Sequence, residues 1–164
     1  MNSSSSISIR PATAGDCSLI LRFIIALAEY ENLRHEVVAT EASLRATLFG
    51  ERPGAEVLIA DWNSQPAGFA LFFPNYSTFL GQPGIYLEDL FVFDDYRGRG
   101  MGKALLARLA ALTLERRGAR LDWSVLDWNQ PSIDFYRSIG ARSLDEWTQF
   151  RLTGRALLNL AKDA

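Results

Sequence analysis

The sequence contains almost no cysteine or histidine. Cys17 is the one cysteine and His35 the one histidine among 164 residues. A single cysteine cannot form an internal disulfide, and these two residues cannot supply a cysteine and histidine cluster with the spacing of a metal site. We therefore expect a protein without a bound metal that works in a reducing cytoplasm, with Cys17 as a small buried residue and His35 as a solvated one.

An excess of positive charge is also absent. The chain has 17 basic and 19 acidic residues and a net charge of -2, so it lacks the positive field that holds DNA, RNA or an anionic membrane. Its longest apolar runs, such as 19–28, are too short to cross a bilayer. Residues 1–6 lack the basic and apolar parts of a secretory signal. We expect a protein that binds neither nucleic acid nor membrane and is not exported.

The rest of the composition is that of an ordinary globular domain. Hydrophobic residues make up 48% of the chain and charged residues 22%. A chain of this length buries enough apolar surface to fold without disulfides, and no repeat or low-complexity linker interrupts it. We expect residues 1–6 to form a disordered segment and residues 7–164 to form a single domain.

Strand and helix patterns alternate along the chain. Six segments have the alternation or the short apolar runs of strands, namely 7–9, 56–62, 67–73, 85–93, 120–125 and 149–152. Five segments have helical spacing, mostly with capping residues, namely 20–27, 40–49, 101–117, 131–139 and 155–162. The segments 30–38 and 75–84 are predicted to be loops. This order predicts an α/β fold with a mixed sheet.

A glycine-rich segment, residues 96–103, joins the strand 85–93 to the helix 101–117 and reads Tyr-Arg-Gly-Arg-Gly-Met-Gly-Lys. Glycines let the backbone approach a phosphate, and the amides at the start of a helix favour an anion. A nucleoside-triphosphate loop would need glycine at Arg97 and a hydroxyl residue at Ala104, and a dinucleotide fingerprint would need glycine at Lys103. The segment therefore indicates another kind of anion site, or a tight turn with solvated arginines.

Three segments carry a resemblance to a known family: YLEDLFV at 86–92, DYRGRGMG at 95–102 and VLDWNQPSIDFYRSIGA at 125–141. Together they resemble the GNAT superfamily of acyl-CoA-dependent acetyltransferases, in the branch of the spermidine/spermine and thialysine acetyltransferases. The similarity extends from Ile9 to about Leu158. It implies the GNAT fold, a mixed, mostly antiparallel twisted sheet of six to seven strands flanked by helices.

The resemblance also implies a reaction. Acetyl-CoA would be the cosubstrate, and its acetyl group would pass directly, in a ternary complex, to the primary amine of a small cationic substrate. Such substrates are thialysine, lysine-like amines, diamines and polyamines. The family is usually dimeric, so we expect a homodimer with the acceptor site near the subunit boundary. Two alternatives stay open: a non-catalytic acyl-CoA-binding regulatory domain and a protein N-acetyltransferase.

Residues that would bind acetyl-CoA follow from the same resemblance. The amides of the glycine loop would bind the pyrophosphate of CoA, and a backbone N–H near Leu90 would polarise the thioester carbonyl. Asn129 would contact the CoA arm, although it is an equally good helix cap. The full set is Leu90, Phe91, Val92, Arg97, Gly98, Arg99, Gly100, Met101, Gly102, Lys103, Asn129, Ser132 and Tyr136.

Two residues match the catalytic positions of the family. An ammonium acceptor must lose a proton before its nitrogen can attack. The resemblance implies that Glu88 takes this proton through a water molecule and that Tyr136 protonates the leaving thiolate. The residues alone also allow simpler roles, since Glu88 or Asp89 could face solvent or pair with an arginine, and Tyr136 could pack in its helix.

The acceptor pocket should offer carboxylates and aromatic rings to a cation. The matching positions are Tyr30, Glu31, Glu88, Asp89 and Trp147. Ordinary packing or surface charge would also account for these residues. In the segment 75–84, Ser77 and Phe79 stand near the place where spermidine acetyltransferases carry an aspartate and a tryptophan. The loss of that carboxylate favours a shorter amine.

Overall fold

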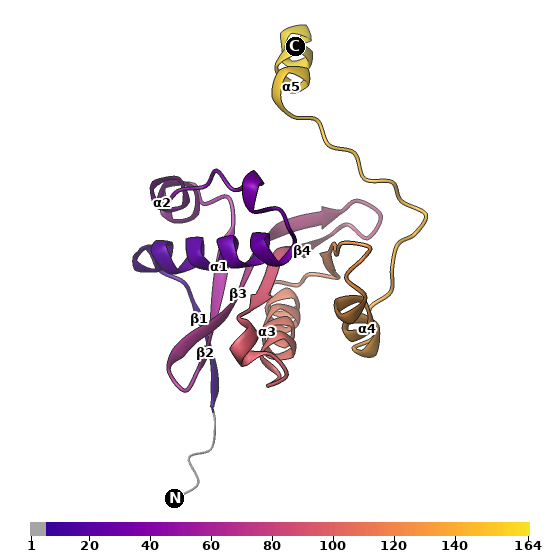
Figure 1. Ribbon diagram of the computed structural model, residues 1–164. Helices are drawn as coiled ribbons and strands as arrows, with labels where there is room; N and C mark the ends of the chain where they lie inside the picture. The colour runs from indigo at the N-terminus through magenta and orange to yellow at the C-terminus, as the bar shows by residue number, and fades with distance from the viewer. Residues whose placement is uncertain (1–5) are drawn as a thin grey trace, which may run out of the picture. The chain divides into compact units, whose positions relative to one another are not determined.

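The structure is a computed structural model that describes residues 6–164 (Figure 1). The chain divides after Ser124 into two compact units, which are described separately. The predicted disordered segment lies outside the described residues except for Ser6. The backbone N–H of Ser6 donates a hydrogen bond to Oδ1 of Asn63 at 3.0 Å.

The first unit contains a five-stranded sheet. The strands are β1 (Ile7–Pro11), β2 (Glu56–Trp62), β3 (Gln65–Ser77), β4 (Gln82–Val92) and β5 (Leu121–Trp123), and they lie in that order. The first four strands pair antiparallel, and β5 pairs parallel with β4. The predicted α/β class with a mixed, mostly antiparallel sheet is confirmed.

Two details of the predicted sheet are wrong. The described residues form five strands rather than six to seven, because the segment 149–152 is not a strand. Its alternating pattern is present, but a strand also needs a neighbour for its backbone, and Phe150 is 90% exposed. The segment 75–84 is not one long loop, since β3 and β4 pair through Ser77 and Gln82 before the chain turns.

Six helical segments lie in the described part of the first unit, residues 6–124. They are η1 (Ala14–Asp16), α1 (Cys17–Tyr30), η2 (Arg34–Glu36), α2 (Glu41–Phe49), η3 (Asp94–Tyr96) and α3 (Met101–Glu115), where η marks a short 3-10 turn. The Thr40 side chain accepts a hydrogen bond from the Ser43 N–H at 3.1 Å, which confirms the predicted start of α2.

The hydrophobic core fixes α1 against the sheet beside β4. Phe23 of α1 is fully buried and stacks on Phe69 of β3, with 5.1 Å between the ring centroids. Phe91 of β4 belongs to the same core cluster. Alternate strand residues point to the other face, where α3 packs. Full burial of one such side chain stabilises the folded state by about 1.5–3 kcal/mol. The packing of these rings therefore fixes the position of the end of β4.

The second unit contains α4 (Gln130–Ser138), α5 (Gly154–Leu160) and the short turn η4 (Ala161–Asp163). These bounds confirm the two helices predicted there to within about two residues. Oδ1 of Asn129 accepts a hydrogen bond from the Ser132 N–H at 3.4 Å, so Asn129 caps α4. None of the helices between residues 6 and 164 combines the length and the apolar character that crossing a membrane requires.

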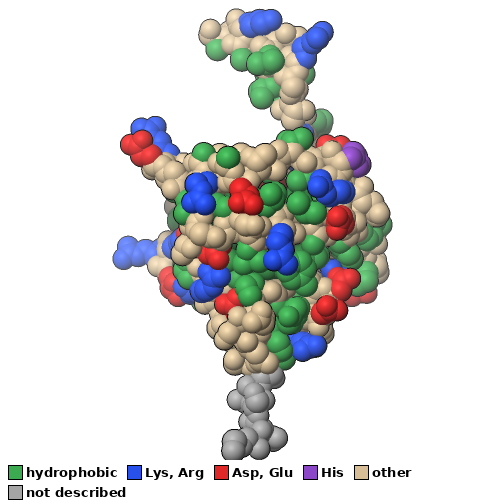
Figure 2. Space-filling view, turned by 60° about the vertical axis from the view of Figure 1, so that its left-hand side comes forward, with side chains coloured by type: hydrophobic (Ala, Val, Ile, Leu, Met, Phe, Trp, Pro, Cys, Tyr) green, Lys and Arg blue, Asp and Glu red, His purple; other side chains and the backbone are tan. Residues whose placement is uncertain are grey.

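Charges of both signs are interspersed on the surface. Figure 2 shows basic and acidic side chains side by side, with hydrophobic side chains between them, on the face that it presents. Some are paired, such as Arg116 with Glu56 at 2.6 Å and Arg10 with Asp16 at 2.9 Å. This mixture agrees with the small net charge of the chain.

Candidate active site

A β-bulge in β4 sets the position of the two predicted acidic residues. Across the β3–β4 ladder, Leu71 pairs with Asp89 and Phe72 pairs with Leu87, so Glu88 is the extra residue without a partner. A bulge interrupts the alternation that would otherwise send neighbouring side chains to opposite faces. Glu88 is exposed, whereas Asp89 is partly buried. Two adjacent carboxylates therefore occupy different environments at one irregular point of the sheet.

Three carboxylates interact at this bulge. Burial, and to a smaller extent the negative charges of Glu88 and Glu31, raise the pKa of Asp89 to about 6. Glu31 follows directly after α1, and burial raises its pKa as well. Within residues 6–164, no basic side chain forms an ion pair with any of these three. A cation bound here would relieve the repulsion and favour the ionised form of Asp89.

Tyr30, the last residue of α1, lies beside the start of the glycine loop. Its ring centroid is 4.7 Å from the guanidinium carbon of Arg97, and the Phe91 ring lies 5.4 Å from the same carbon. Of the predicted acceptor residues, Tyr30 thus lies near Arg97. Glu31 and Glu88 are both close enough to Asp89 to act on its charge. Trp147 belongs to the second unit and is 71% exposed, and its predicted role stays a prediction.

The glycine loop has the backbone geometry of an open anion site. Gly98 and Gly100 have φ angles of +72° and +84°, which residues with a Cβ rarely adopt, and Gly100 is the N-cap of α3. Gly102 lies inside the first turn of α3, where glycine costs about 1 kcal/mol relative to alanine. A Cβ on Gly102 would meet no protein atom within 4 Å. Packing therefore does not require this glycine, and its missing Cβ leaves room for a ligand to approach the backbone.

Both arginines of the loop direct their guanidinium groups toward the protein. Nε of Arg97 donates to the carbonyl oxygen of Val92 at 3.0 Å, and its Nη2 lies 2.9 Å from a carboxylate oxygen of Asp94. Arg99 donates to the Asp95 carbonyl at 3.0 Å and lies over the Trp62 ring at 5.0 Å. Groups that remain open to an anion include the backbone amides of the loop and of the first turn of α3, together with the exposed Lys103.

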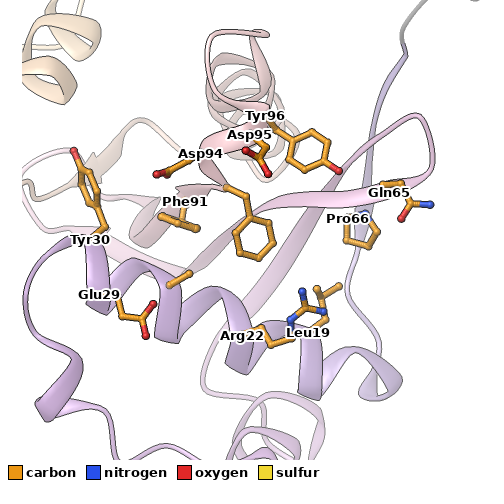
Figure 3. A pocket seen from close by; sticks show the side chains of 12 residues that line it. Leu19, Arg22, Glu29, Tyr30, Gln65, Pro66, Phe91, Asp94, Asp95 and Tyr96 are labelled. Carbon is orange, nitrogen blue, oxygen red and sulfur yellow. The ribbon is translucent and has the colours of Figure 1, made fainter.

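A pocket that the sequence did not predict lies along α1 (Figure 3). Its volume is about 630 Å³, and Tyr30 stands at one end with Gln65 and Pro66 of the β2–β3 hairpin at the other. The remaining lining residues are Leu19, Arg22, Ala26, Glu29, Phe91, Phe93, Asp94, Asp95 and Tyr96. The apolar residues of α1 have the spacing of core positions, so the sequence did not indicate that one face of this helix lines a pocket.

Comparison with known proteins assigns the family. Residues 24–141 match the acetyltransferase (GNAT) family. Thialysine N-epsilon-acetyltransferase of Sus scrofa is 40% identical over 95% of this chain and 98% of its own length. L-ornithine N5-acetyltransferase NATA1 of Arabidopsis thaliana is 34% identical over 94% of this chain and 87% of its own length. The chain therefore belongs to the GNAT acetyltransferase family.

Solved structures agree with this assignment. An integron cassette protein from the mobile metagenome of V. cholerae superposes with a TM-score of 0.80 and 29% identity, covering 96% of this chain and 98% of that one. An aminoglycoside acetyltransferase from a soil metagenome shares the fold at a TM-score of 0.75 and 17% identity, over 91% and 97% of the two chains. The predicted branch is confirmed, and so is the predicted activity at the level of amine N-acetylation with acetyl-CoA.

Proposed function

We propose that the protein transfers the acetyl group of acetyl-CoA to the primary amine of a small cationic compound by direct transfer in a ternary complex. One observation carries this proposal: the carboxylates of Glu31, Glu88 and Asp89 interact at the bulge of β4, the strand that leads into the glycine loop. An anion site and a cation site on one continuous segment fit a reaction between CoA and an ammonium compound.

The amine is proposed to be short, such as thialysine, a lysine-like amine or a diamine rather than a long polyamine. The tip of the β3–β4 hairpin offers no carboxylate, because residues 75–84 include no aspartate or glutamate. Ser77 is buried there, and Phe79 is 93% exposed. A long polycation would therefore lose a countercharge there. Two relatives matched over most of their length are named for thialysine and L-ornithine, and a third is named a spermidine/spermine acetyltransferase-like protein.

Glu88 is proposed as the proton acceptor. Its exposed carboxylate can take a proton from the ammonium group through water, because an alkyl ammonium with a pKa near 10.4 is almost wholly protonated at neutral pH. Asp89 and Glu31 provide the countercharge that binds the ammonium group. The freed nitrogen attacks the thioester carbonyl, a new C–N bond forms and the C–S bond breaks. Tyr136 is proposed to protonate the departing thiolate.

The glycine loop is proposed to hold the pyrophosphate of acetyl-CoA, with Asn129 and Ser132 along the CoA arm. Its fit to CoA rests on the open space above Gly98, Gly100 and Gly102, at the start of a helix. Acetyl-CoA supplies the activated acetyl group. A backbone N–H near Leu90 would stabilise negative charge on the carbonyl oxygen.

The protein is further proposed to act as a single-domain homodimer in the cytoplasm, with Trp147 at the acceptor site. The family resemblance supports the dimer. So does the exposure of the apolar residues Trp147 and Phe150 in the second unit, which a partner subunit would cover.

A thiol-release assay tests the activity. Purified protein is mixed with acetyl-CoA and single amines, and free CoA is followed over time. The proposal predicts amine-dependent release, with a higher kcat/KM for thialysine, ornithine or a diamine than for spermine. Binding of CoA without release for any acceptor would support a non-catalytic domain instead. Release only with peptide amino groups would support a protein N-acetyltransferase.

A further inference from the structure

Arg97 joins three separate segments through one guanidinium group. Its Nε donates to the Val92 carbonyl at the end of β4, and its Nη2 pairs with Asp94 of η3. The guanidinium carbon lies over the ring of Tyr30, at the end of α1, 4.7 Å from the ring centroid, and 5.4 Å from that of Phe91. These contacts connect the start of the glycine loop with the last residue of α1.

The contacts use different parts of the guanidinium group and therefore reinforce one another. The two polar contacts lie in the plane of the group, through N–H donors, and fix the orientation of that plane. The face of a guanidinium group stays free for an aromatic ring when its edge makes hydrogen bonds. A lysine could keep the charge but could not satisfy an edge and a face at once. The arrangement thus depends on arginine itself.

The position of Tyr30 bears on the acceptor carboxylates. Glu31 is the next residue along the chain, and its charge acts on Asp89 at the bulge of β4. A shift of Tyr30 would therefore move Glu31 relative to Asp89. Anchoring the end of α1 to the glycine loop keeps the two carboxylates at a constant separation for one bound ammonium group.

We propose that Arg97 is a positioning residue for the acceptor amine, which it serves by holding Tyr30 and the end of α1 against the glycine loop, and that it is not a ligand of the CoA phosphates. The inference rests on the proposed function, because it assigns Arg97 to the acceptor half of the same site. It differs from the sequence prediction, which counted Arg97 among the residues that bind acetyl-CoA.

Arg99 provides a matched comparison on the same loop. It carries the same charge two residues later, but its guanidinium contacts the Asp95 carbonyl and the rings of Trp62 and Tyr96. None of these groups belongs to the acceptor carboxylates or to Tyr30. Arg97→Met and Arg99→Met remove equal charge next to the proposed phosphate site, so a difference between them in the acceptor KM reports on the Tyr30 contact.

Steady-state kinetics and calorimetry with CoA test the proposal. Arg97→Met should raise the KM for the best amine about 3- to 10-fold, the loss expected for one cation–π contact at a partly exposed site, and change the Kd for CoA less than about 2-fold. Arg97→Lys should restore only part of the amine KM. Arg99→Met should raise the amine KM clearly less than Arg97→Met does, because its guanidinium group contacts neither Tyr30 nor the acceptor carboxylates. A large rise in the Kd for CoA with an unchanged amine KM in Arg97→Met would overturn the proposal, as would equal amine KM effects in the two methionine variants.

A double-mutant cycle separates positioning from a general loss of structure. Tyr30→Phe should preserve the amine KM because it keeps the ring, and Tyr30→Leu should raise it. Adding Arg97→Met to Tyr30→Leu should then have little further effect, since the contact is already gone. Independent, additive effects would contradict the link. If Arg97→Met does not fold, the same double-mutant cycle can be made with Arg97→Lys in place of Arg97→Met.

A spectroscopic measurement does not depend on the proposed activity. In the ¹⁵N-labelled protein, the Nε–H resonance of Arg97 should be shifted by the ring currents of Tyr30 and Phe91, and Tyr30→Leu should remove the Tyr30 part of that shift. A resonance that Tyr30→Leu does not change would refute the link even if amines are acetylated. A shifted resonance in a protein that acetylates no amine would leave the contact standing and reject the proposed function.

Discussion

Replacing Asp89 by asparagine should stabilise the folded protein at neutral pH while weakening amine binding. The pKa of this carboxyl rises from 3.8 to about 6 on folding, chiefly because of burial. The folded state therefore disfavours the ionised form, by about 3 kcal/mol, since a tenfold change in proton affinity corresponds to about 1.4 kcal/mol. Asparagine removes that charge at nearly constant shape. On the proposed function, the carboxylate would stabilise the complex with a cation at the expense of the free fold.

The sign of the pH dependence follows from the two pKa values. Below pH 3.8 the carboxyl is protonated in both states and costs nothing. Between pH 3.8 and about 6 the unfolded chain ionises first, so the cost grows, and above pH 6 it is constant. The free energy of unfolding of Asp89→Asn should exceed that of wild type by up to about 3 kcal/mol at pH 7.5 and by about 1 kcal/mol at pH 4.5.

Urea denaturation at the two pH values measures this difference. Glu51→Gln serves as a control for the change in net charge, because Glu51 is exposed and such a substitution changes stability by at most about 0.5 kcal/mol. A variant Asp89→Asn that is less stable than wild type at pH 7.5 would refute the reasoning. An identical gain at both pH values would also refute it, because the effect would then not come from ionisation.

Three further predictions concern the reaction and the glycine loop. Glu88→Gln should lower kcat/KM about 10-fold or more at neutral pH and recover partly toward the pKa of the amine, near 10.4, and an unchanged pH–rate profile would remove Glu88 as the base. Tyr136→Phe should lower kcat about 10-fold or more with little effect on the amine KM, and a wild-type kcat would mean that Tyr136 only packs. Gly102→Ala should stabilise α3 by about 0.5–1 kcal/mol yet raise the Kd for CoA, measured by thermal unfolding and calorimetry. Its control is Gly118→Ala, which should destabilise the fold because a Cβ there would lie 2.8 Å from Cγ2 of Thr113. Unchanged CoA affinity in Gly102→Ala would contradict the loop assignment.

Local signals in the sequence predicted most of the fold correctly. The Thr40 cap, the apolar spacing of α1 and the glycines before α3 each act within a few residues, so the sequence displays them directly. The adjacent acidic residues Glu88 and Asp89 in an apolar strand are likewise visible in the sequence itself. The sequence alone left open whether a bulge lies between these two residues and their neighbours. The register of β3 against β4 shows that the bulge is present.

Features that depend on contacts between distant segments were predicted less well. The alternation in 149–152 was read as a strand, but pairing decides whether a strand forms, and the described residues offer it no neighbour. The polar residues of 75–84 suggested a loop, although cross-strand hydrogen bonds extend β3 and β4 into it. The family resemblance placed Arg97 among the residues that bind acetyl-CoA, which stays a prediction, and nothing in the local sequence indicated its contact with Tyr30.

The most direct test of the account is to measure both products of one reaction. Protein, acetyl-CoA and a short primary amine such as thialysine are incubated together, with free thiol and acetylated amine quantified from the same sample by colorimetry and mass spectrometry. The account predicts one acetylated amine for each thiol released, at a rate that falls when Asp89 is replaced by asparagine. Thiol release without an acetylated amine, or no release at any amine concentration, would contradict it.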